Sequence, residues 1–533
     1  MDYSLFRKFK KSDNEGLNYH SFPMPGKIAV ALTKPLKKAA DFGLAYTPGV
    51  AEPCKKIHED VKYAFDYTAK WNTVAVVSDG SAVLGLGNIG PEASKPVMEG
   101  KSALFKYLSG IDSFDLEVNA HDADSLSNLI LNITPGLGGI NLEDVAAPIC
   151  FDVDKKVREK AEIPFFHDDQ NGTSIVAAAA VFNSVHLTNK DISKVKIVCN
   201  GAGAAAIAVL NFLVHLGVSV SNCSVFDSKG MIHKGRPVDA YRGKYAQDKE
   251  LTLREAMKGA DIFIGLSVGN VLDEDHIKSM SENPIVFAMA NPVPEILPSK
   301  VKAIRSDAIV GSGRSDFENQ VNNVLCFPFI FRGALDVRAK EVNLAMQKAC
   351  CSALCELARD MDEFGKANVL PGAFDPLLIY KLSKAVADAA IESGVASCDL
   401  PESYSDYLDY LVYGSVLENV YLPKSFEGDD FNYVKKIFAF KGIEQKSSFS
   451  MKPLNFSNLK EDLKGKSGEI VFDSFNVSFG SNGDLQTSSP EKVIEGLSEK
   501  NQLLGVILEE DKTVLFNTEN RPWFGVKLFS SLK

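Results

Sequence analysis

The feature that most constrains the fold of this chain is a glycine-rich turn between an apolar strand and an Ala-rich helix. Residues 196–206 have the sequence Lys-Ile-Val-Cys-Asn-Gly-Ala-Gly-Ala-Ala-Ala. This order of strand, turn and helix is typical of the first part of a dinucleotide-binding unit. Turns of this composition also open helices for packing reasons alone, so the turn needs support from other residues.

The spacing of residues in and after the turn suits a dinucleotide. The residues of the turn are Gly201, Ala202, Gly203, Ala204 and Ala205. The first glycine allows a tight turn, the second lets the backbone approach a pyrophosphate, and the helix that follows favours phosphate groups. Asp227 ends the next predicted strand, where a carboxylate would accept a hydrogen bond from a ribose 2′-hydroxyl. We expect NAD or NADP as cofactor; Asp227 favours NAD, a preference that neighbouring residues can override.

Alternating strand and helix patterns define the fold class. Apolar runs predict strands at 195–199, 223–226, 262–264, 285–288 and 308–310. A long Ala-rich helix is expected from Gly172, and helices return up to about residue 395. This alternation predicts a doubly wound parallel sheet. A strand at 73–77 with helices at 96–108 and 125–133 predicts a further α/β domain before it.

These patterns divide the chain into four parts. We expect an N-terminal arm at 1–25, an α/β domain at 26–166, a Rossmann-type domain with further helices at 167–400, and an appendage at 401–533. In the appendage, short β-like runs at 469–472, 504–508 and 513–516 alternate with turn residues. The appendage is therefore predicted to be small and β-rich, and we assign it no chemistry.

Composition sets limits on partners and compartment. The chain has 533 residues, of which 45% are hydrophobic and 24% charged, and its formal net charge is -11. A negative chain without a large Lys/Arg block argues against nucleic-acid binding, and no apolar run reaches membrane-spanning length. The nine cysteines lie mostly in apolar runs, which suits reduced thiols in the cytoplasm or an organelle matrix. A zinc site on Cys350, Cys351 and Cys355 is less expected than simple packing, because no histidine stands among them.

Two acidic clusters are candidates for a divalent-metal site. Glu143 and Asp144 form one cluster, and Asp168 and Asp169 can supply the remaining carboxylate. A single acidic residue is most simply solvated or caps a helix, but these clusters border apolar runs, where uncompensated charge is costly. Adjacent side chains diverge on a regular element, so the first pair can share an ion only from an irregular turn, which the glycines at 138–139 make plausible. Oxygen ligands alone suit Mg²⁺ or Mn²⁺.

Two residues are candidates for proton transfer. Lys101 follows Gly100 at what is predicted to be a glycine-started helix. A lysine near a divalent cation can lose its proton near neutrality and become a base. Tyr46 precedes a turn whose backbone is fixed by Pro48 and Gly49. On composition alone, Lys101 is more simply a surface lysine and Tyr46 a half-buried aromatic residue.

Longer blocks of sequence resemble the malic enzymes of the smaller, bacterial type. The blocks are residues 46–51 (Tyr-Thr-Pro-Gly-Val-Ala), 78–93, 96–101 (Pro-Val-Met-Glu-Gly-Lys), 139–144 (Gly-Ile-Asn-Leu-Glu-Asp), 166–170 (Phe-His-Asp-Asp-Gln) and 319–328. They follow one another in unbroken order from about residue 20 to about residue 395. Blocks of this length are far more specific than the glycine turn by itself.

The resemblance implies oxidative decarboxylation of malate to pyruvate and CO₂, with reduction of NAD(P)⁺ and a divalent cation. It implies that Lys101 is the general base and also contacts the substrate, and that Tyr46 is the general acid. The other residues it implies are the metal ligands Glu143, Asp144 and Asp169 with Asp168 close by, Asn291 near the nicotinamide, and Asn323, beside Asn322, at the substrate carboxylate. It further implies a homodimer or a higher homo-oligomer.

Two residues depart from the family pattern. Asn171 stands where the family usually carries histidine, and Phe329 stands where it usually carries glycine. A bulky Phe329 near Asn323 could reshape substrate access. The competing interpretations are a catalytically silent nucleotide- or metabolite-binding protein on the same fold, and an enzyme that stops at oxaloacetate or lactate. The retained acid, base and carboxylates argue against the silent protein, since a pure binder needs no such pair.

Overall fold

The structure is a computed structural model, and it divides the chain into two compact units. The first unit is Met1–Phe374 with Lys381–Leu400, and the second is Asp375–Tyr380 with Pro401–Lys533. The residues that the structure describes are 13–21, 25–34, 36–83, 85–120, 122–413, 436, 440 and the strands β11 to β16 given below.

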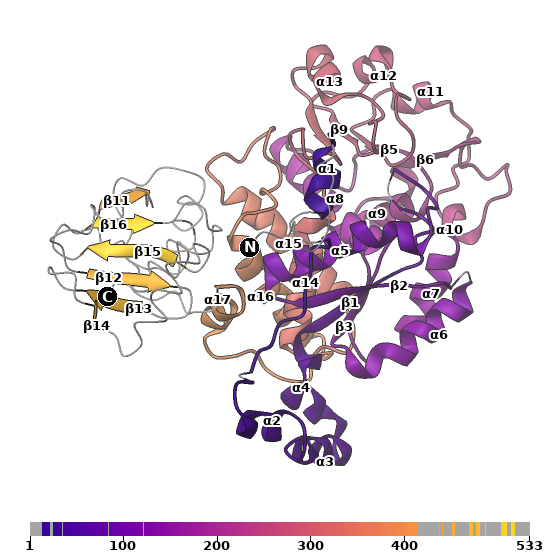
Figure 1. The fold of residues 1–533 in the computed structure, drawn as a ribbon. Coiled ribbons are helices and arrows are strands. Elements are labelled where there is room, and N and C mark those ends of the chain that lie inside the picture. The colour runs from indigo at the N-terminus through magenta and orange to yellow at the C-terminus, as the bar shows by residue number, and fades with distance from the viewer. Residues whose placement is uncertain are drawn as a thin grey trace. The chain divides into compact units, whose positions relative to one another are not determined.

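The first sheet of the first unit is four-stranded and parallel, in the order β2-β1-β3-β4 (Figure 1). Its strands are β1 (Thr73–Ser78), β2 (Asp112–Glu117), β3 (Gly139–Leu142) and β4 (Phe165–His167). Its helices are α5 (Pro91–Ser109), α6 (Ala123–Ile133) and α7 (Ile149–Arg158), with the short 3₁₀ helix η4 (Thr134–Gly136). Every residue of β1 is buried, as expected for a β-branched run at the centre of a parallel sheet covered on both faces.

Short helices precede this sheet. They are α1 (Glu15–Ser21), α2 (Ala39–Ala45), α3 (Ala51–Glu59), η2 (Val61–Tyr63), α4 (Ala64–Tyr67) and η3 (Ala69–Asn72). None of the residues of α2, α3 or α4 is buried. In Figure 1 the helices α2 and α3 project away from the body that carries α5 and α8.

The second sheet of the first unit confirms the predicted doubly wound fold. Its order is β10-β9-β8-β5-β6-β7, parallel except for β7, which runs antiparallel to β6. The strands are β5 (Ile197–Asn200), β6 (Cys223–Asp227), β7 (Gly230–Met231), β8 (Ile262–Gly265), β9 (Ile285–Ala288) and β10 (Ile309–Ser312). The order reverses beside β5, and the carboxyl ends of the strands at such a point are the usual nucleotide site.

Further helices and 3₁₀ turns follow β4 along the chain, and one of them, α14, packs against α5. They are α8 (Asp168–Leu187), α9 (Ala204–His215), η5 (Val220–Asn222), α10 (Ala240–Gly243), α11 (Leu253–Met257), α12 (Glu274–Lys278), α13 (Pro298–Ile304), η6 (Asn323–Leu325), α14 (Phe327–Asp336), α15 (Leu344–Arg359) and α16 (Leu377–Glu392). α8 and α9 pack closely against each other, and α15 packs on α8. The Ala-rich sequence of α8, with thirteen buried residues, allows this close approach.

The second unit confirms the predicted β-rich appendage. It contains α17 (Tyr404–Tyr413) and a six-stranded sheet in the order β11-β16-β15-β12-β13-β14. The strands are β11 (Ser450–Pro453), β12 (Gly468–Phe472), β13 (Asn476–Phe479), β14 (Leu485–Gln486), β15 (Leu503–Leu508) and β16 (Thr513–Phe516). Apart from the parallel pair of β11 and β16, its strands pair antiparallel.

Two helix starts differ from the sequence prediction. α8 begins at Asp168 and not at Gly172, so both acidic residues lie on its first turn. α5 begins at Pro91, after Gly90 with φ 81°, and Gly100 lies inside it. α8 starts where the buried strand β4 ends, a tertiary constraint that overrides the local glycine signal, whereas α5 starts at the local signal of Gly90 followed by Pro91.

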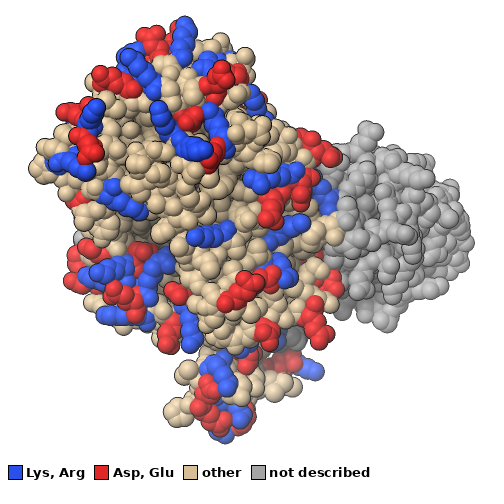
Figure 2. Space-filling model, turned by 180° about the vertical axis from the view of Figure 1, so that it is seen from behind, with Lys and Arg blue, Asp and Glu red and all other residues tan. Residues whose placement is uncertain are grey.

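All nine cysteines are unpaired, and Cys350, Cys351 and Cys355 lie buried on α15. Within the described ranges, no helix is both long enough and apolar enough to cross a membrane. On the face drawn in Figure 2, Lys and Arg side chains are interspersed with Asp and Glu side chains over the described residues.

Candidate active site

The candidate metal ligands lie at the carboxyl ends of two neighbouring strands. Glu143 and Asp144 directly follow β3, and Asp168 and Asp169 directly follow β4. β3 and β4 are parallel partners, so both ends meet at one edge of the sheet. One oxygen from each of Glu143, Asp144 and Asp169 lies within 4.8 Å of the others. The sequence prediction that these carboxylates could share one ion is consistent with this geometry.

An unusual backbone conformation lets two adjacent carboxylates converge. Asp144 has φ 52°, in the left-handed region, and its N–H donates to Asp169 Oδ2 at 2.9 Å. The turn is therefore irregular, as predicted, but the glycines at 138–139 serve packing. A Cβ at position 138 would collide with the Lys70 carbonyl, and one at 139 would lie 2.9 Å from the Phe331 ring.

Lys101 is buried against these carboxylates, so the expectation from composition alone that it is a surface lysine is wrong. Its side chain is 8% exposed, and Nζ donates to Glu143 Oε1 at 3.0 Å and to Asp168. The ammonium also stands 4.0 Å above the centre of the Phe327 ring, a favourable cation–π distance. The helix α5 thus carries Lys101 directly into the acidic cluster.

The charges of the cluster are not balanced by Lys101 alone. Burial, together with neighbouring carboxylates, raises the pKa of Asp144 to about 9. Burial also raises the pKa of Asp168 to about 8, although Lys101 opposes the shift. Burial lowers the pKa of Lys101, but the carboxylates of Asp168 and Glu143 outweigh it and raise that pKa above its ordinary value. Such a site is short of positive charge, and a divalent cation with oxygen ligands fits it.

The burial of the individual carboxylates also supports a divalent cation at this cluster. Asp168 Oδ1 is buried and has no hydrogen-bond partner among the described residues. Asp169, in contrast, is only partly covered, with 34% of its side chain exposed, so the cluster is open on one side. The donor set and this opening suit entry of Mg²⁺ or Mn²⁺ and of a small substrate.

Sequence reasoning missed the residues that brace the metal-site loop. Ser81 Oγ accepts from the Ala146 N–H at 2.8 Å and donates to Asp79 Oδ1 at 2.5 Å. Asn141 Nδ2 donates to Glu143 Oε2 at 2.8 Å. The signal was present, since these residues lie in the blocks 78–93 and 139–144, but nothing in a single sequence assigns them a partner.

A glycine on α8 leaves room for the site. A Cβ at Gly172 would collide with the Asp168 carboxylate and would lie 3.2 Å from Asn323 Cβ. Asn323 therefore lies beside the first turn of α8, next to the carboxylates. Asn322 has a different task, because its side chain accepts from the Val324 N–H at 3.0 Å and caps η6.

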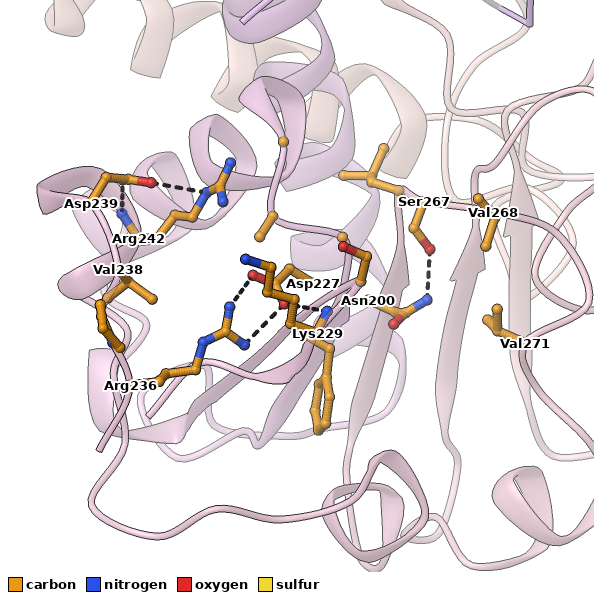
Figure 3. A pocket seen from close by; sticks show the side chains of 17 residues that line it. Asn200, Asp227, Lys229, Arg236, Val238, Asp239, Arg242, Ser267, Val268 and Val271 are labelled. Atoms are coloured by element: carbon orange, nitrogen blue, oxygen red, sulfur yellow. Dashed lines mark hydrogen bonds and ion pairs between the residues drawn. The ribbon is translucent and has the colours of Figure 1, made fainter. Parts of the chain in front are cut away.

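The glycine turn opens a nucleotide-sized pocket at the ends of β5 and β6. Gly201 has φ 128°, and a Cβ there would collide with the Leu266 carbonyl, so only glycine fits. The pocket has a volume of about 590 Å³, and Gly201, Ala202, Gly203 and Asp227 line it (Figure 3). Ala204 and Ala205 form the first turn of α9 and are not among its lining residues.

Asn291 lies on the loop after β9. Its Nδ2 donates to the Met289 carbonyl at 3.4 Å. A Cβ at Gly85 would lie 3.8 Å from the Pro292 ring, so the loop after β1 comes close to this position. The buried Glu295, which sequence reasoning missed, accepts from the N–H groups of Ala290 and Ser267, each at 3.1 Å, and ties the loops after β8 and β9 together.

Three residues that the sequence analysis singled out do not belong to the carboxylate cluster formed within a single chain. Tyr46, at the end of α2, is 64% exposed, and its ring contacts Phe42 with 6.2 Å between centroids. Phe329 is 1% exposed inside α14, so its effect on substrate access stays a prediction. Asn171, on the first turns of α8, is partly buried.

Comparison with protein families agrees with the geometry. A model described as the malic enzyme N-terminal domain matches residues 25–128, and one described as the malic enzyme NAD binding domain matches residues 170–394. The first match contains β1 and β2, and the second contains the whole second sheet; β3 and β4 lie in the segment 129–169 between the two matches.

Individual relatives give the same picture. The chain is 49% identical to an NADP-dependent malic enzyme of Haemophilus influenzae, over 75% of this chain and 56% of that protein. It is also 49% identical to an NAD-dependent malic enzyme of Rhizobium meliloti, over 75% of this chain and 54% of that protein. The chain thus spans about half the length of these curated relatives.

A solved structure is similar over the same part of the chain. The crystal structure of malic enzyme from Pyrococcus horikoshii matches with a TM-score of 0.71 and 40% sequence identity, covering 75% of this chain and 95% of that one.

Proposed function

The chain belongs to the malic enzyme family, and on that premise we propose that it oxidatively decarboxylates malate to pyruvate and CO₂ with reduction of NAD(P)⁺. The observation that carries the proposal is the contact of a buried lysine with carboxylates at the ends of β3 and β4. A protein that only binds a nucleotide has no use for a lysine buried in an acidic cluster, whose desolvation is costly.

Glu143, Asp144 and Asp169 would hold the cation. When bound, Mg²⁺ or Mn²⁺ supplies Lewis acidity and offsets the negative charge that keeps Lys101 protonated. Lys101 then takes the proton of the C2 hydroxyl of malate. Asp168, which accepts from Lys101, would orient the amine, and Asn323, whose Cβ lies beside the first turn of α8, would donate to a substrate carboxylate.

The residues Gly201, Ala202, Gly203, Ala204 and Ala205 would hold the pyrophosphate of the cofactor at the start of α9, and Asn291 would lie beside its nicotinamide. When bound, NAD(P)⁺ accepts the hydride from C2 of the substrate.

Tyr46 completes the proposal as the general acid that protonates C3 after CO₂ has left. We propose that it serves the site of a second copy of the chain. Several apolar side chains in the same part of the sequence are largely exposed, among them Val30 at 100%, Leu44 at 76% and Val61 at 78%. Surfaces of this kind mark protein–protein interfaces, and a two-fold dimer would cover two of them at once.

The cysteines indicate the redox environment in which the protein works. All nine cysteines are unpaired, and seven of them are buried. We propose a reducing environment such as the cytoplasm.

Replacing Lys101 tests the function. With malate, Mn²⁺ and NADP⁺ or NAD⁺, Lys101→Ala is expected to lower kcat by about 10²–10⁴, the range lost with a general base, while cofactor binding persists. Absorbance at 340 nm gives the rate, and identification of pyruvate separates this reaction from ones that end at oxaloacetate or lactate. A Lys101→Ala rate close to wild type would refute the assignment.

A further inference from the structure

The cofactor pocket contains a charge arrangement that the proposed activity does not explain. Asp227 stands at the end of β6, where its carboxylate was expected to accept from a ribose 2′-hydroxyl. In the structure the Arg236 guanidinium covers that carboxylate, and Lys229 lies beside the pair (Figure 3).

The Asp227–Arg236 ion pair is bidentate and firmly held. Arg236 Nη1 donates to Asp227 Oδ1 at 3.0 Å, and Nη2 donates to Oδ2. The same Nη1 donates to the Gly230 and Met231 carbonyls at 3.3 and 3.2 Å. Because both carboxylate oxygens and the β7 backbone fix the guanidinium, its place in the pocket is set before any ligand arrives.

The pocket is also cationic at this end. Its lining includes the cations Lys229, Arg236 and Arg242 against the two carboxylates Asp227 and Asp239. Arg242 pairs with Asp239 at 3.2 Å, and Arg236 pairs with Asp227. The ammonium of Lys229 has no carboxylate within 4.0 Å among the residues that the structure describes. One positive charge is left over, directly beside the expected position of the ribose.

A 2′-phosphate would use these groups better than a 2′-hydroxyl. The hydroxyl would have to donate to a carboxylate that already accepts from Arg236 and from the Lys229 N–H at 2.8 Å. A phosphate is an acceptor only, and it suits the remaining guanidinium N–H groups and the ammonium. The neighbouring carboxylate would repel a phosphate if it stood alone, but the bidentate pair neutralises it.

We propose that Arg236 and Lys229 bind the 2′-phosphate of NADP, and that Asp227 holds Arg236 in place and does not select NAD. The inference rests on the proposed function for the identity of the ligand, and it reverses the preference expected from the sequence. Relatives of equal identity carry both NADP and NAD in their names, so the preference depends on residues of this chain.

Binding of nucleotide fragments to the full chain tests the proposal without catalysis. Calorimetric titration would compare 2′,5′-ADP, which carries the 2′-phosphate, with 5′-ADP, which does not. Wild-type protein is expected to bind 2′,5′-ADP at least about tenfold more tightly, as charge-assisted contacts to phosphate provide. Equal binding of the two, or tighter binding of 5′-ADP, would overturn the proposal.

Two pocket variants and one control variant test which residues cause the preference for 2′,5′-ADP over 5′-ADP. Arg236→Gln is expected to bring the ratio of the two affinities close to one, and Lys229→Gln to lower it several-fold. Should Arg236→Gln fail to fold, Lys229→Gln carries the test, because Lys229 lines the pocket and forms no ion pair with a described residue. Arg254→Gln removes a guanidinium that pairs with Asp273 and Asp275 outside the pocket, and its ratio should stay that of wild type. An unchanged ratio in both pocket variants would refute the assignment.

Asp227→Asn separates the two roles of this carboxylate. If Asp227 only holds Arg236, the variant binds 5′-ADP as tightly as wild type. If Asp227 accepts a hydrogen bond from the 2′-hydroxyl, the variant binds 5′-ADP more weakly than wild type. A chain that prefers 2′,5′-ADP but never oxidises malate would refute the proposed function alone. A chain that oxidises malate with NAD⁺ and shows no preference would refute this inference alone.

Discussion

At the scale of single residues, the site depends on positions where an added Cβ would collide with a neighbouring side chain. Gly172 faces the Asp168 carboxylate, and that carboxylate accepts from Lys101. The lysine is held by charge, by hydrogen bonds and by the Phe327 ring, all within the interior of the first unit. Small changes in side-chain volume here should therefore alter chemistry before they alter the fold.

Gly172→Ala tests this tight fit. The added methyl group must displace Asp168, so the amine of Lys101 loses its orientation, and kcat for malate should fall at least about tenfold, or about 1.4 kcal/mol. The control is Gly100→Ala, inside α5, where a Cβ would meet no atom within 4 Å. That change should keep the activity and raise the free energy of unfolding by about 0.5–1 kcal/mol. Full activity in Gly172→Ala would show that Asp168 does not orient the base.

At the scale of elements, the helices α2 and α3 have few contacts that bury their side chains. None of their residues is buried, and Leu44 and Tyr46 are largely exposed. Isolated helices of seven to nine residues are marginal in water, so they need a partner surface. The proposed second copy supplies that surface and receives Tyr46 in return.

Mixing two inactive variants tests the exchange. Tyr46→Phe and Lys101→Ala each remove one proton-transfer group, and each should be nearly inactive alone. If acid and base come from different copies, mixed dimers regain about one intact site, and up to about half of the dimers in an equal mixture are mixed. Rates would be measured after reversible dissociation and reassociation. No recovery, with mixed dimers demonstrated by mass, would place both groups in the same copy.

The elements were largely predictable from sequence, and the tertiary constraints were not. The strands β8 and β9 could be predicted because buried parallel strands form continuous apolar runs between helices. The start of α8 could not, since the end of β4, and not a local cap, decides it. The paired carboxylates were recognisable from their apolar surroundings. The exposure of Tyr46 and the covering of Asp227 by Arg236 could not be predicted, because they depend on how the loops fold and no motif of the sequence encodes that.

At the scale of the whole chain, the residues proposed for chemistry all belong to the first unit. The family models end at residue 394, and the second unit contributes a separate six-stranded sheet. The first unit has its own buried clusters around both of its sheets, so we expect it to be stable without the six-stranded sheet of the second unit.

Truncation after Tyr413 tests this independence. The shortened chain keeps both sheets of the first unit and α17, and kcat and KM for malate should stay within about twofold of the full chain. Mass measurement in solution would show whether it assembles as the full chain does. A folded truncation without activity would contradict the independence of the first unit and give the appendage a functional role.

The proposed chemistry depends on one divalent cation held by Glu143, Asp144 and Asp169 beside Lys101. A crystal grown with Mn²⁺, with data recorded for anomalous scattering, measures this directly. The account predicts a single strong peak bounded by these three carboxylates and next to the amine of Lys101, which disappears in Asp169→Asn. A peak elsewhere, or none at these carboxylates in an active protein, would contradict it.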